Sequence, residues 1–195
     1  IVTVMLELRA RFDEEANLYW KERLEEEGVR VLIGVPNMKV HAKICIIKKR
    51  IKNKTIQYGF VSTGNLNEST SRIYGDHCLL TANRKVMADI NRIFHFLEKP
   101  LVSHMKFLRQ CKTLLVCPTG MRRHLIRLID NEIANAKKKL PASMTLKMNS
   151  ISDEELITKL YEAARAGVEI KMIVRGIFCM MTESSKFKIK PYAVS

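Results

Sequence analysis

The sequence lacks both a long apolar run and a regular pattern of cysteines. No stretch approaches the roughly 20 consecutive apolar residues that a transmembrane helix needs, so the sequence predicts no membrane-spanning segment. It contains no CxxC pair, and no Cys and His residues stand at the spacing of a zinc site. We therefore expect the five cysteines to be buried free thiols of a cytoplasmic protein, because disulfides are rare in that reducing compartment.

The two ends of the sequence also lack familiar features. There is no initiator methionine and no signal peptide, and the first residues, IVTVMLELR, have the composition of a β-strand. The last residues, KIKPYAVS, stop where another strand is expected to begin. We expect the 195 residues to be an excised part of a longer protein.

Acidic residues are scarce in the middle of the chain. The net charge is +14, and residues 29–150 carry 23 Lys and Arg residues against 6 Asp and Glu residues. An excess of this kind attracts polyanions, which include nucleic acid, polyphosphate, nucleotides and acidic lipid head groups. The alternative is a basic surface that serves only solubility.

The chain alternates predicted strands and helices, which indicates an α/β fold. Strands are predicted at 1–9, 29–35, 56–64, 74–82, 111–120, 143–149 and 168–176. Another strand is predicted around His41, entered by a turn at Pro36 and Asn37, and residues 48–55 are predicted to be a charged hairpin connection. Helices are predicted at 13–28, 85–98, 121–139 and 152–167. The β-α-β order favours parallel strands with right-handed crossovers. A change near residues 100–108 predicts two domains, at 1–105 and 106–195.

The stretch PNMKVHAKICIIKKR, residues 36–50, is the strongest candidate for chemistry. If it is a strand, His41, Lys43 and Cys45 share one face, because side chains alternate with period 2. A neutral imidazole is a nucleophile near pH 7, and a lysine beside it can neutralise phosphate oxygens. The alternatives are a structural histidine and a surface lysine.

Other polar groups stand where predicted strands end. Arg11, the Thr63–Asn65 turn and Arg175 lie at or just past such ends, where ligands gather in open α/β sheets. Guanidinium groups suit phosphate oxygens, although Arg11 could instead pair with the acids at 13–15. The sequence STGNLN adds Asn65 and Asn67, which can orient an imidazole, donate to phosphate or simply form a turn.

Four segments in order resemble bacterial polyphosphate kinase. They are ARFDEEAN (10–17), MKVHAK (38–43), STGNLNE with SRIY (62–74) and MIVRG (172–176), and their spacings agree over essentially the whole chain. The resemblance implies α/β, phospholipase D-like βαβ domains with mixed sheets flanked by helices. It further implies that the chain holds the first such catalytic domain and the opening part of the second.

The resemblance also implies an activity, its substrates and its site residues. The activity is reversible transfer of the ATP γ-phosphate to inorganic polyphosphate through a phosphohistidine at His41, with Mg²⁺ as cofactor and Lys43 assisting. Arg11 is expected near the Mg²⁺–phosphate cluster, with no protein residue as a direct metal ligand. Tyr74 and Arg175 are expected to contact nucleotide, and Asn65 and Asn67 to bind phosphate.

Further implications concern partners and completeness. The resemblance implies a homo-oligomer for the full-length protein, ATP/ADP and polyphosphate rather than nucleic acid as partners, and room for peripheral membrane association. A second active-site histidine and the N-terminal domains are expected outside this sequence, so the fragment alone is expected to be inactive.

One position departs from the wider phospholipase D superfamily. Its motif is H-x-K followed, after four further residues, by Asp, and this chain has Lys48 there. The departure disfavours a phosphodiesterase or nuclease, which is the first alternative function. The second alternative is a non-enzymatic polyanion-binding module, supported by the basic middle of the chain.

Overall fold

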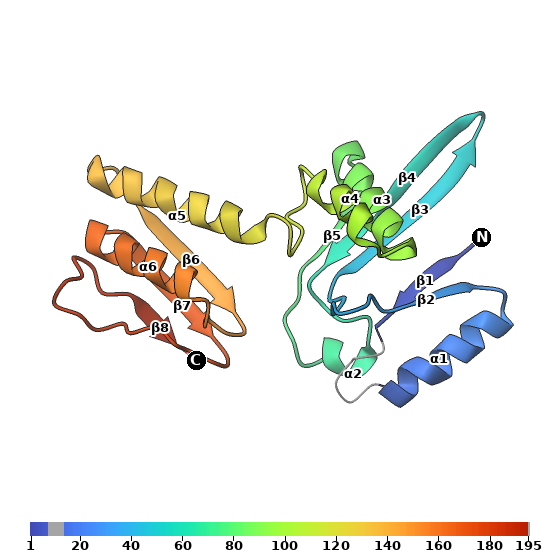
Figure 1. Cartoon of the computed structure of the whole chain (residues 1–195), viewed down its shortest axis with the longest axis horizontal. Helices are drawn as coiled ribbons and strands as arrows, with labels where there is room; N and C mark the ends of the chain where they lie inside the picture. Colours follow the sequence, from blue (N-terminus) through green and yellow to red (C-terminus); the bar gives the residue numbers. More distant parts are fainter. Residues whose placement is uncertain (8–13, 195) are drawn as a thin grey trace. The chain divides into compact units, whose positions relative to one another are not determined.

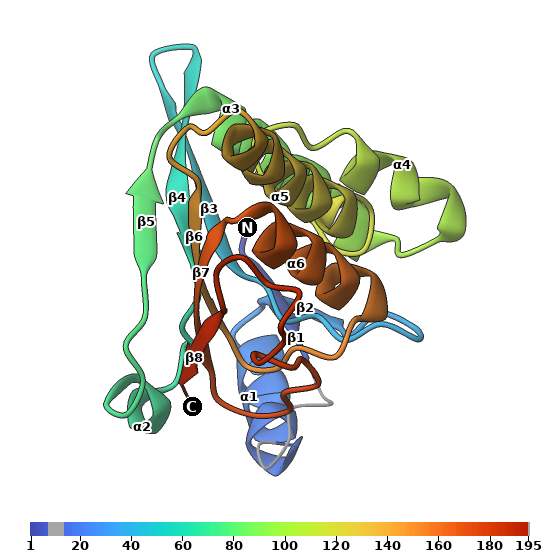
Figure 2. The same ribbon diagram turned by 90° about the vertical axis from the view of Figure 1, so that its left-hand side faces the viewer.

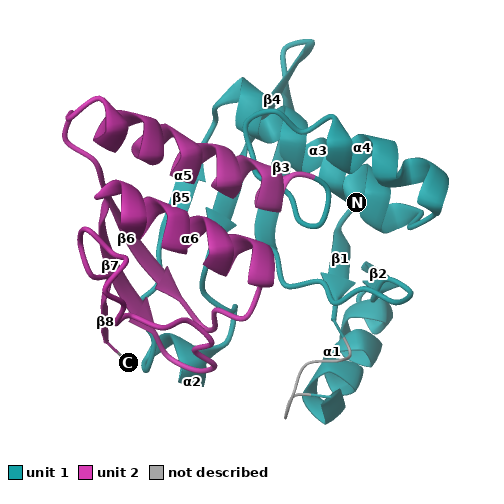
Figure 3. Cartoon of the chain, turned by 60° about the vertical axis from the view of Figure 1, so that its left-hand side comes forward, with its two compact units in different colours: residues 1–119 teal, residues 120–195 magenta. Residues whose placement is uncertain are grey.

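A computed structural model describes residues 1–7 and 14–194. The chain divides into two compact units, residues 1–119 and residues 120–195 (Figure 3). Each unit has its own β-structure and its own buried apolar clusters.

Unit 1 begins with the predicted β-α-β arrangement. Strand β1 (Thr3–Leu6) pairs in parallel with β2 (Arg30–Ile33), and helix α1 (Glu14–Glu26) connects them (Figure 1). Glu14 and Glu15 lie in the first turn of α1, where carboxylates stabilise the positive end of the helix dipole. After α1 the chain reverses at Gly28, whose φ of +73° suits glycine. Asp13, the first residue of the predicted helix, lies outside the described residues.

The second sheet of unit 1 is antiparallel. Strands β3 (Lys43–Ile51), β4 (Lys54–Ser62) and β5 (Cys78–Thr81) pair in the order β3-β4-β5. Lys52 and Asn53 join β3 to β4 with φ values of +42° and +57°, as a two-residue type I′ hairpin turn requires. The hairpin is longer than predicted, because the charged residues 48–51 continue strand β3.

Helix α3 (Arg84–Glu98) covers one face of this sheet. Its buried residues Val86, Met87 and Ile90 pack against three residues of β3 and β4, namely Ile44, Ile46 and Val61. A second cluster joins the end of α3 to α4 (Met105–Arg109); it contains Val35, Ile93, Phe96, Leu97 and Leu108. Two short elements, α2 (Glu68–Ser71) and the 3₁₀ helix η1 (Val102–His104), complete unit 1.

Asp89 on α3 explains why one predicted strand is wrong. Residues 111–120 form bends and turns rather than the expected strand. The Asp89 carboxylate, 1% exposed, accepts the backbone N–H groups of residues 112, 113 and 114 at 3.0, 2.7 and 2.9 Å. Its other oxygen accepts from Arg92 at 2.6 Å. The backbone donors of this segment therefore bond to a buried side chain instead of a neighbouring strand.

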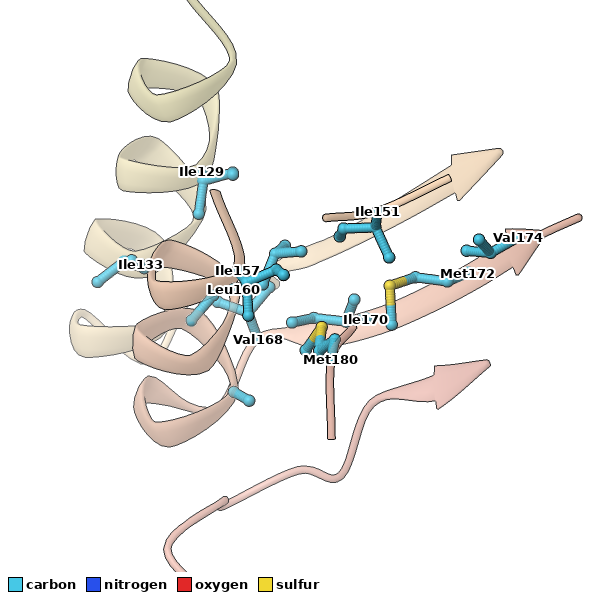
Figure 4. Packing of buried hydrophobic residues seen from close by; sticks show 12 residues of the cluster. Ile129, Ile133, Ile151, Ile157, Leu160, Val168, Ile170, Met172, Val174 and Met180 are labelled. Atoms are coloured by element: carbon cyan, nitrogen blue, oxygen red, sulfur yellow. The ribbon is translucent and has the colours of Figure 1, made fainter. Parts of the chain in front are cut away.

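Unit 2 is a parallel sheet with two helices on one face (Figures 1 and 2). Its strands β6 (Ser143–Met148), β7 (Glu169–Val174) and β8 (Tyr192–Val194) pair in that order. Helices α5 (Met121–Lys137) and α6 (Glu154–Ala166) supply the apolar residues that meet the sheet. Every second residue of β7 is buried, and Ile170, Met172 and Val174 point into this core (Figure 4). The α/β class predicted from the sequence is confirmed.

The cysteines are only partly as expected. All five thiols are free, with Cys45 and Cys111 half-buried. Burial of the other three was predicted wrongly, because Cys78, Cys117 and Cys179 are exposed. Among the described helices, none has the length and apolar character needed to cross a membrane.

Candidate functional site

The His41 imidazole lies beside the Lys43 ammonium group, as the sequence pattern suggested. The cause differs from the predicted strand alternation, because β3 begins only at Lys43 and His41 precedes it. The Lys43 side chain turns back toward the preceding residues. Its Nζ lies 2.9 Å from Nδ1 of His41 and donates to the His41 carbonyl oxygen, also at 2.9 Å.

The segment before His41 is fixed from two sides. Met38 N–H donates to the Val35 carbonyl at 3.1 Å, and Asn37 has a φ of +58°, so Pro36 and Asn37 form the predicted turn. Val40 packs against the cluster between α3 and α4, and its N–H donates to the Glu7 carboxylate at 2.6 Å. Backbone and packing thus fix the position from which His41 projects.

The electrostatics of the pair favour a neutral imidazole. Packing around the ring lowers the pKa of His41, and the nearby charges of Lys43 and Lys39 lower it further, against an opposing bond to its own backbone. Packing also lowers the pKa of Lys43, which Asp76 opposes by its negative charge. A neutral ring keeps one nitrogen lone pair at neutral pH, which a nucleophile requires.

The Asp76 side chain packs against the turn that follows β4. Thr63 Oγ1 donates to Asp76 Oδ1 at 3.0 Å, and Thr63 N–H donates to the His77 carbonyl at 3.0 Å. A Cβ atom on Gly64 would lie 2.6 Å from Asp76 Oδ2, so only glycine permits this close approach. The motif STG therefore positions the Asp76 carboxylate, whose negative charge raises the pKa of Lys43 against the effect of burial.

Sequence reasoning missed both carboxylates of this site, Glu7 and Asp76. Glu7 follows a strand that read as purely structural, and its contact with Val40 spans 33 residues of sequence. Asp76 precedes β5, and its position next to a strand end was the available signal. Glu7 fixes the backbone next to His41 through Val40, and the negative charge of Asp76 acts on Lys43.

Of the two asparagines and the tyrosine predicted after β4, Asn67 has a local structural role. Asn67 caps α2: its side-chain oxygen accepts from Thr70 N at 3.1 Å and from Ser69 Oγ at 2.7 Å. Asn65 is exposed. Tyr74 was expected at the start of a strand, but it lies four residues before β5 and is 50% exposed.

The structure does not test whether the two predicted arginines join this cluster. Arg11 lies outside the described residues. Arg175 follows β7 in unit 2, as predicted, and its N–H donates to the Met148 carbonyl at 3.3 Å. The structure therefore brings together His41, Lys43 and Asp76, all within unit 1.

The described residues do not fit a resident metal site. Within 1–7 and 14–194, no three His, Cys, Asp or Glu side chains are grouped so that they could hold a metal ion.

Comparison with known families gives the class of the chain. Residues 1–102 match the family model described as polyphosphate kinase C-terminal domain 1, and residues 114–191 match polyphosphate kinase C-terminal domain 2. The chain belongs to the polyphosphate kinase family, and the resemblance found in the sequence is confirmed.

Individual relatives agree with this assignment. The polyphosphate kinases of Vibrio cholerae and Escherichia coli K12 are 46% and 42% identical over 176 residues, which is 90% of this chain. The crystal structure of polyphosphate kinase from Porphyromonas gingivalis matches with a TM-score of 0.79 and 38% identity, covering 98% of this chain and 31% of that one. The chain spans about a quarter of the length of the curated relatives, 24% and 25% for these two.

Proposed function

We propose that this chain contributes His41, as nucleophile, to an enzyme that transfers phosphoryl groups reversibly between ATP and inorganic polyphosphate. The observation that carries the proposal is the 2.9 Å contact between Lys43 Nζ and His41 Nδ1. It joins a nitrogen nucleophile to a cation that can receive phosphate oxygens, and it lies in a chain of the polyphosphate kinase family. We further propose that units 1 and 2 belong to the first and second phospholipase D-like catalytic domains.

The proposed reaction has two transfers. A lone pair of the neutral imidazole forms a bond to the γ-phosphorus of ATP while the bond from that phosphorus to the β,γ-bridging oxygen breaks and ADP leaves. The phosphorylated ring gives the proton on its second nitrogen to solvent. In the second transfer a proton from solvent returns to that nitrogen, and a terminal oxygen of polyphosphate attacks the same phosphorus. The N–P bond breaks, neutral imidazole is restored and the polyphosphate chain is one unit longer. The reverse sequence forms ATP.

The neighbours of His41 have separate roles in this proposal. The lowered pKa keeps the imidazole unprotonated, and Lys43 offers its charge to the equatorial oxygens as the phosphoryl group moves. The negative charge of Asp76 opposes the decrease of the Lys43 pKa and so favours the charged form. Asn65, Asn67 and Tyr74 are proposed to contact phosphate or nucleotide; the cap at Asn67 uses its side-chain oxygen and not its NH₂ group.

Some parts of the site are proposed to come from elsewhere. Arg11 and Arg175 would bind phosphate oxygens, and Mg²⁺ would enter bound to the nucleotide phosphates rather than to a protein site. A second histidine from outside this sequence would complete the centre. We also propose that the full-length protein is a cytoplasmic homo-oligomer that can associate with a membrane surface.

The test is transfer of label from ATP to the protein. Full-length protein is incubated with γ-labelled ATP and Mg²⁺, and the label is expected on His41 in an acid-labile, base-stable form. The His41→Ala variant should lose it. His77→Ala is a matched control, because His77 is exposed and its contacts with Thr63 are made by its backbone. Acid-labile label that persists in His41→Ala would refute the assignment.

A further inference from the structure

The tip of the β3–β4 hairpin is an exposed and strongly cationic part of unit 1. Five of its seven residues from 48 to 54 are cations and none is acidic; the cations are Lys48, Lys49, Arg50, Lys52 and Lys54. All seven residues are exposed. The tip extends past the helices that cover the rest of the sheet (Figures 1 and 2).

The five charges of the tip stand apart from the ion pairs of the fold. In the part of the chain that the structure describes, ion pairs join other exposed cations to carboxylates within 4.0 Å, as for Arg72 with Glu68 and Lys171 with Glu169. No such pair among the described residues includes a cation of the hairpin tip. A cluster of like charges without carboxylate partners destabilises the fold by repulsion, and a bound polyanion relieves that cost.

The hairpin also connects the tip to the candidate site. Side chains alternate along β3, so Lys43 and Lys49 point to the same face, and the register places Lys54 on that face as well, opposite Ile51. At a rise of about 3.3 Å per residue, Lys49 lies roughly 20 Å along the strand from Lys43. Cations therefore stand at both ends of a single strand that begins beside His41.

We propose that the hairpin tip binds the inorganic polyphosphate chain whose end reacts at His41. This inference rests on the proposed function and extends it, because it gives the same substrate a second point of attachment. Lys48 and Arg50 point to the opposite face from Lys49, so an extended chain can be held around both sides of the tip. The repeating charge of polyphosphate matches this arrangement.

Two alternative roles of the hairpin cations lead to different expectations. Lysines on an edge strand hinder aggregation, and that role requires no ligand. An anionic lipid surface would use the exposed apolar residues on one face of the hairpin, which are Ile47, Ile51, Ile56 and Tyr58. A lipid surface would not contact Lys48 and Arg50 on the opposite face. A polyphosphate chain can contact cations on both faces, so it is the favoured ligand.

The test compares two triple variants of the full-length protein. In the first, Lys48, Lys49 and Arg50 are changed to Gln; in the second, Lys137, Lys138 and Lys139 are changed to Gln. Both remove three charges at three consecutive exposed positions, so they affect net charge equally. Binding of fluorescent long-chain polyphosphate is measured by anisotropy at several salt concentrations, with circular dichroism to verify folding.

We expect the hairpin variant to bind long-chain polyphosphate at least about tenfold more weakly. Its plot of log affinity against log salt should be flatter by about 2, since each lost phosphate contact reduces that slope by roughly 0.7 to 1. The variant at 137–139 should bind like the wild type. Triphosphate is too short to span site and tip, so its affinity should be equal in all three proteins.

Three results would overturn the proposal. The first is equal affinity of both variants for long-chain polyphosphate. The second is an equal loss of affinity for triphosphate and for long chains in the hairpin variant. The third is a hairpin variant that binds phosphatidylserine vesicles more weakly but binds polyphosphate like the wild type. Labelling of His41 by ATP is measured in the same variants and is expected to be unchanged. Failure of that labelling in the wild type would refute the proposed function, whereas the binding data test the hairpin alone.

Discussion

Asp89 gives the sharpest test of how unit 1 is held together. Its carboxylate is buried between α3 and the chain segment that follows α4, and it accepts four hydrogen bonds, three from backbone N–H groups and one from Arg92. The proposed substitution is Asp89→Asn, which keeps the shape of the side chain but replaces one oxygen by an NH₂ group and removes the charge. Asp89→Ala removes all four bonds.

The expected cost follows from those contacts. Oδ2 accepts hydrogen bonds from the three backbone N–H groups, and Oδ1 accepts one from Arg92. The single oxygen of an Asn side chain can replace only one of these two acceptors, and its NH₂ group then faces the donors that the other oxygen had bound. Arg92 is 36% exposed, so solvent screens that ion pair, and most of the stabilisation comes from the backbone bonds. Bonds to a charged acceptor contribute about 1.5–3 kcal/mol each when buried. We expect a loss of roughly 2–4 kcal/mol for Asp89→Asn and somewhat more for Asp89→Ala.

The assay is urea unfolding followed by circular dichroism and by the fluorescence of Trp20, the single tryptophan, which lies in unit 1. Glu98→Gln is the matched control, because it neutralises an exposed carboxylate on the same helix and should cost less than about 1 kcal/mol. A change for Asp89→Asn as small as that of Glu98→Gln would refute the reasoning.

The pH dependence gives an independent check on the same residue. Burial raises the pKa of Asp89, but the bonds from residues 112–114 and Arg92 outweigh it, so the folded pKa lies below the ordinary value. A lowered folded pKa means that the stabilisation is fully present above the unfolded pKa of about 3.9 and is lost as the pH falls through the folded pKa. The difference between wild type and Asp89→Asn should be constant from neutral pH to about pH 5. It should narrow in stronger acid.

Three further substitutions test the site and the sheet beneath it. Lys43→Met should raise the pKa of His41, because a nearby positive charge is removed, and a histidine NMR titration measures it; an unchanged pKa contradicts the pairing. Asp76→Asn should lower the pKa of Lys43, observable by NMR of its Nζ group, since the opposing negative charge is lost. Gly59→Ala places a Cβ atom 1.9 Å from the Cys45 carbonyl oxygen, so the strands must separate; we expect a loss above about 2 kcal/mol by urea unfolding, and a smaller loss would show that β3 and β4 adjust easily.

Local patterns predicted most of the fold because each element carries its own signals. Helix α6 illustrates this: Asp153 accepts from Leu156 N at 3.0 Å at its start, and Gly167 ends it with a φ of +99°. The predicted helix, 152–167, starts at Ser152, one residue before this observed cap. The segment at 111–119 could not be predicted in the same way, because Asp89, more than twenty residues away, decides its hydrogen bonds. An apolar run predicts a strand correctly only when its backbone N–H groups are available to bond to a neighbouring strand.

The same distinction applies to the candidate site. The nearness of His41 and Lys43 could be inferred because they are two residues apart, although the reason, a lysine that turns back at the start of β3, differs from strand alternation. Glu7 and Asp76 could not be found so simply, since they reach the site through the pairing of distant elements. Short motifs therefore identify the groups that react, while the carboxylates that fix the backbone and balance the charge come from the tertiary fold. Asp76→Asn should therefore lower the pKa of Lys43 without moving the backbone at His41. That backbone is fixed independently by Glu7 and by the packing of Val40.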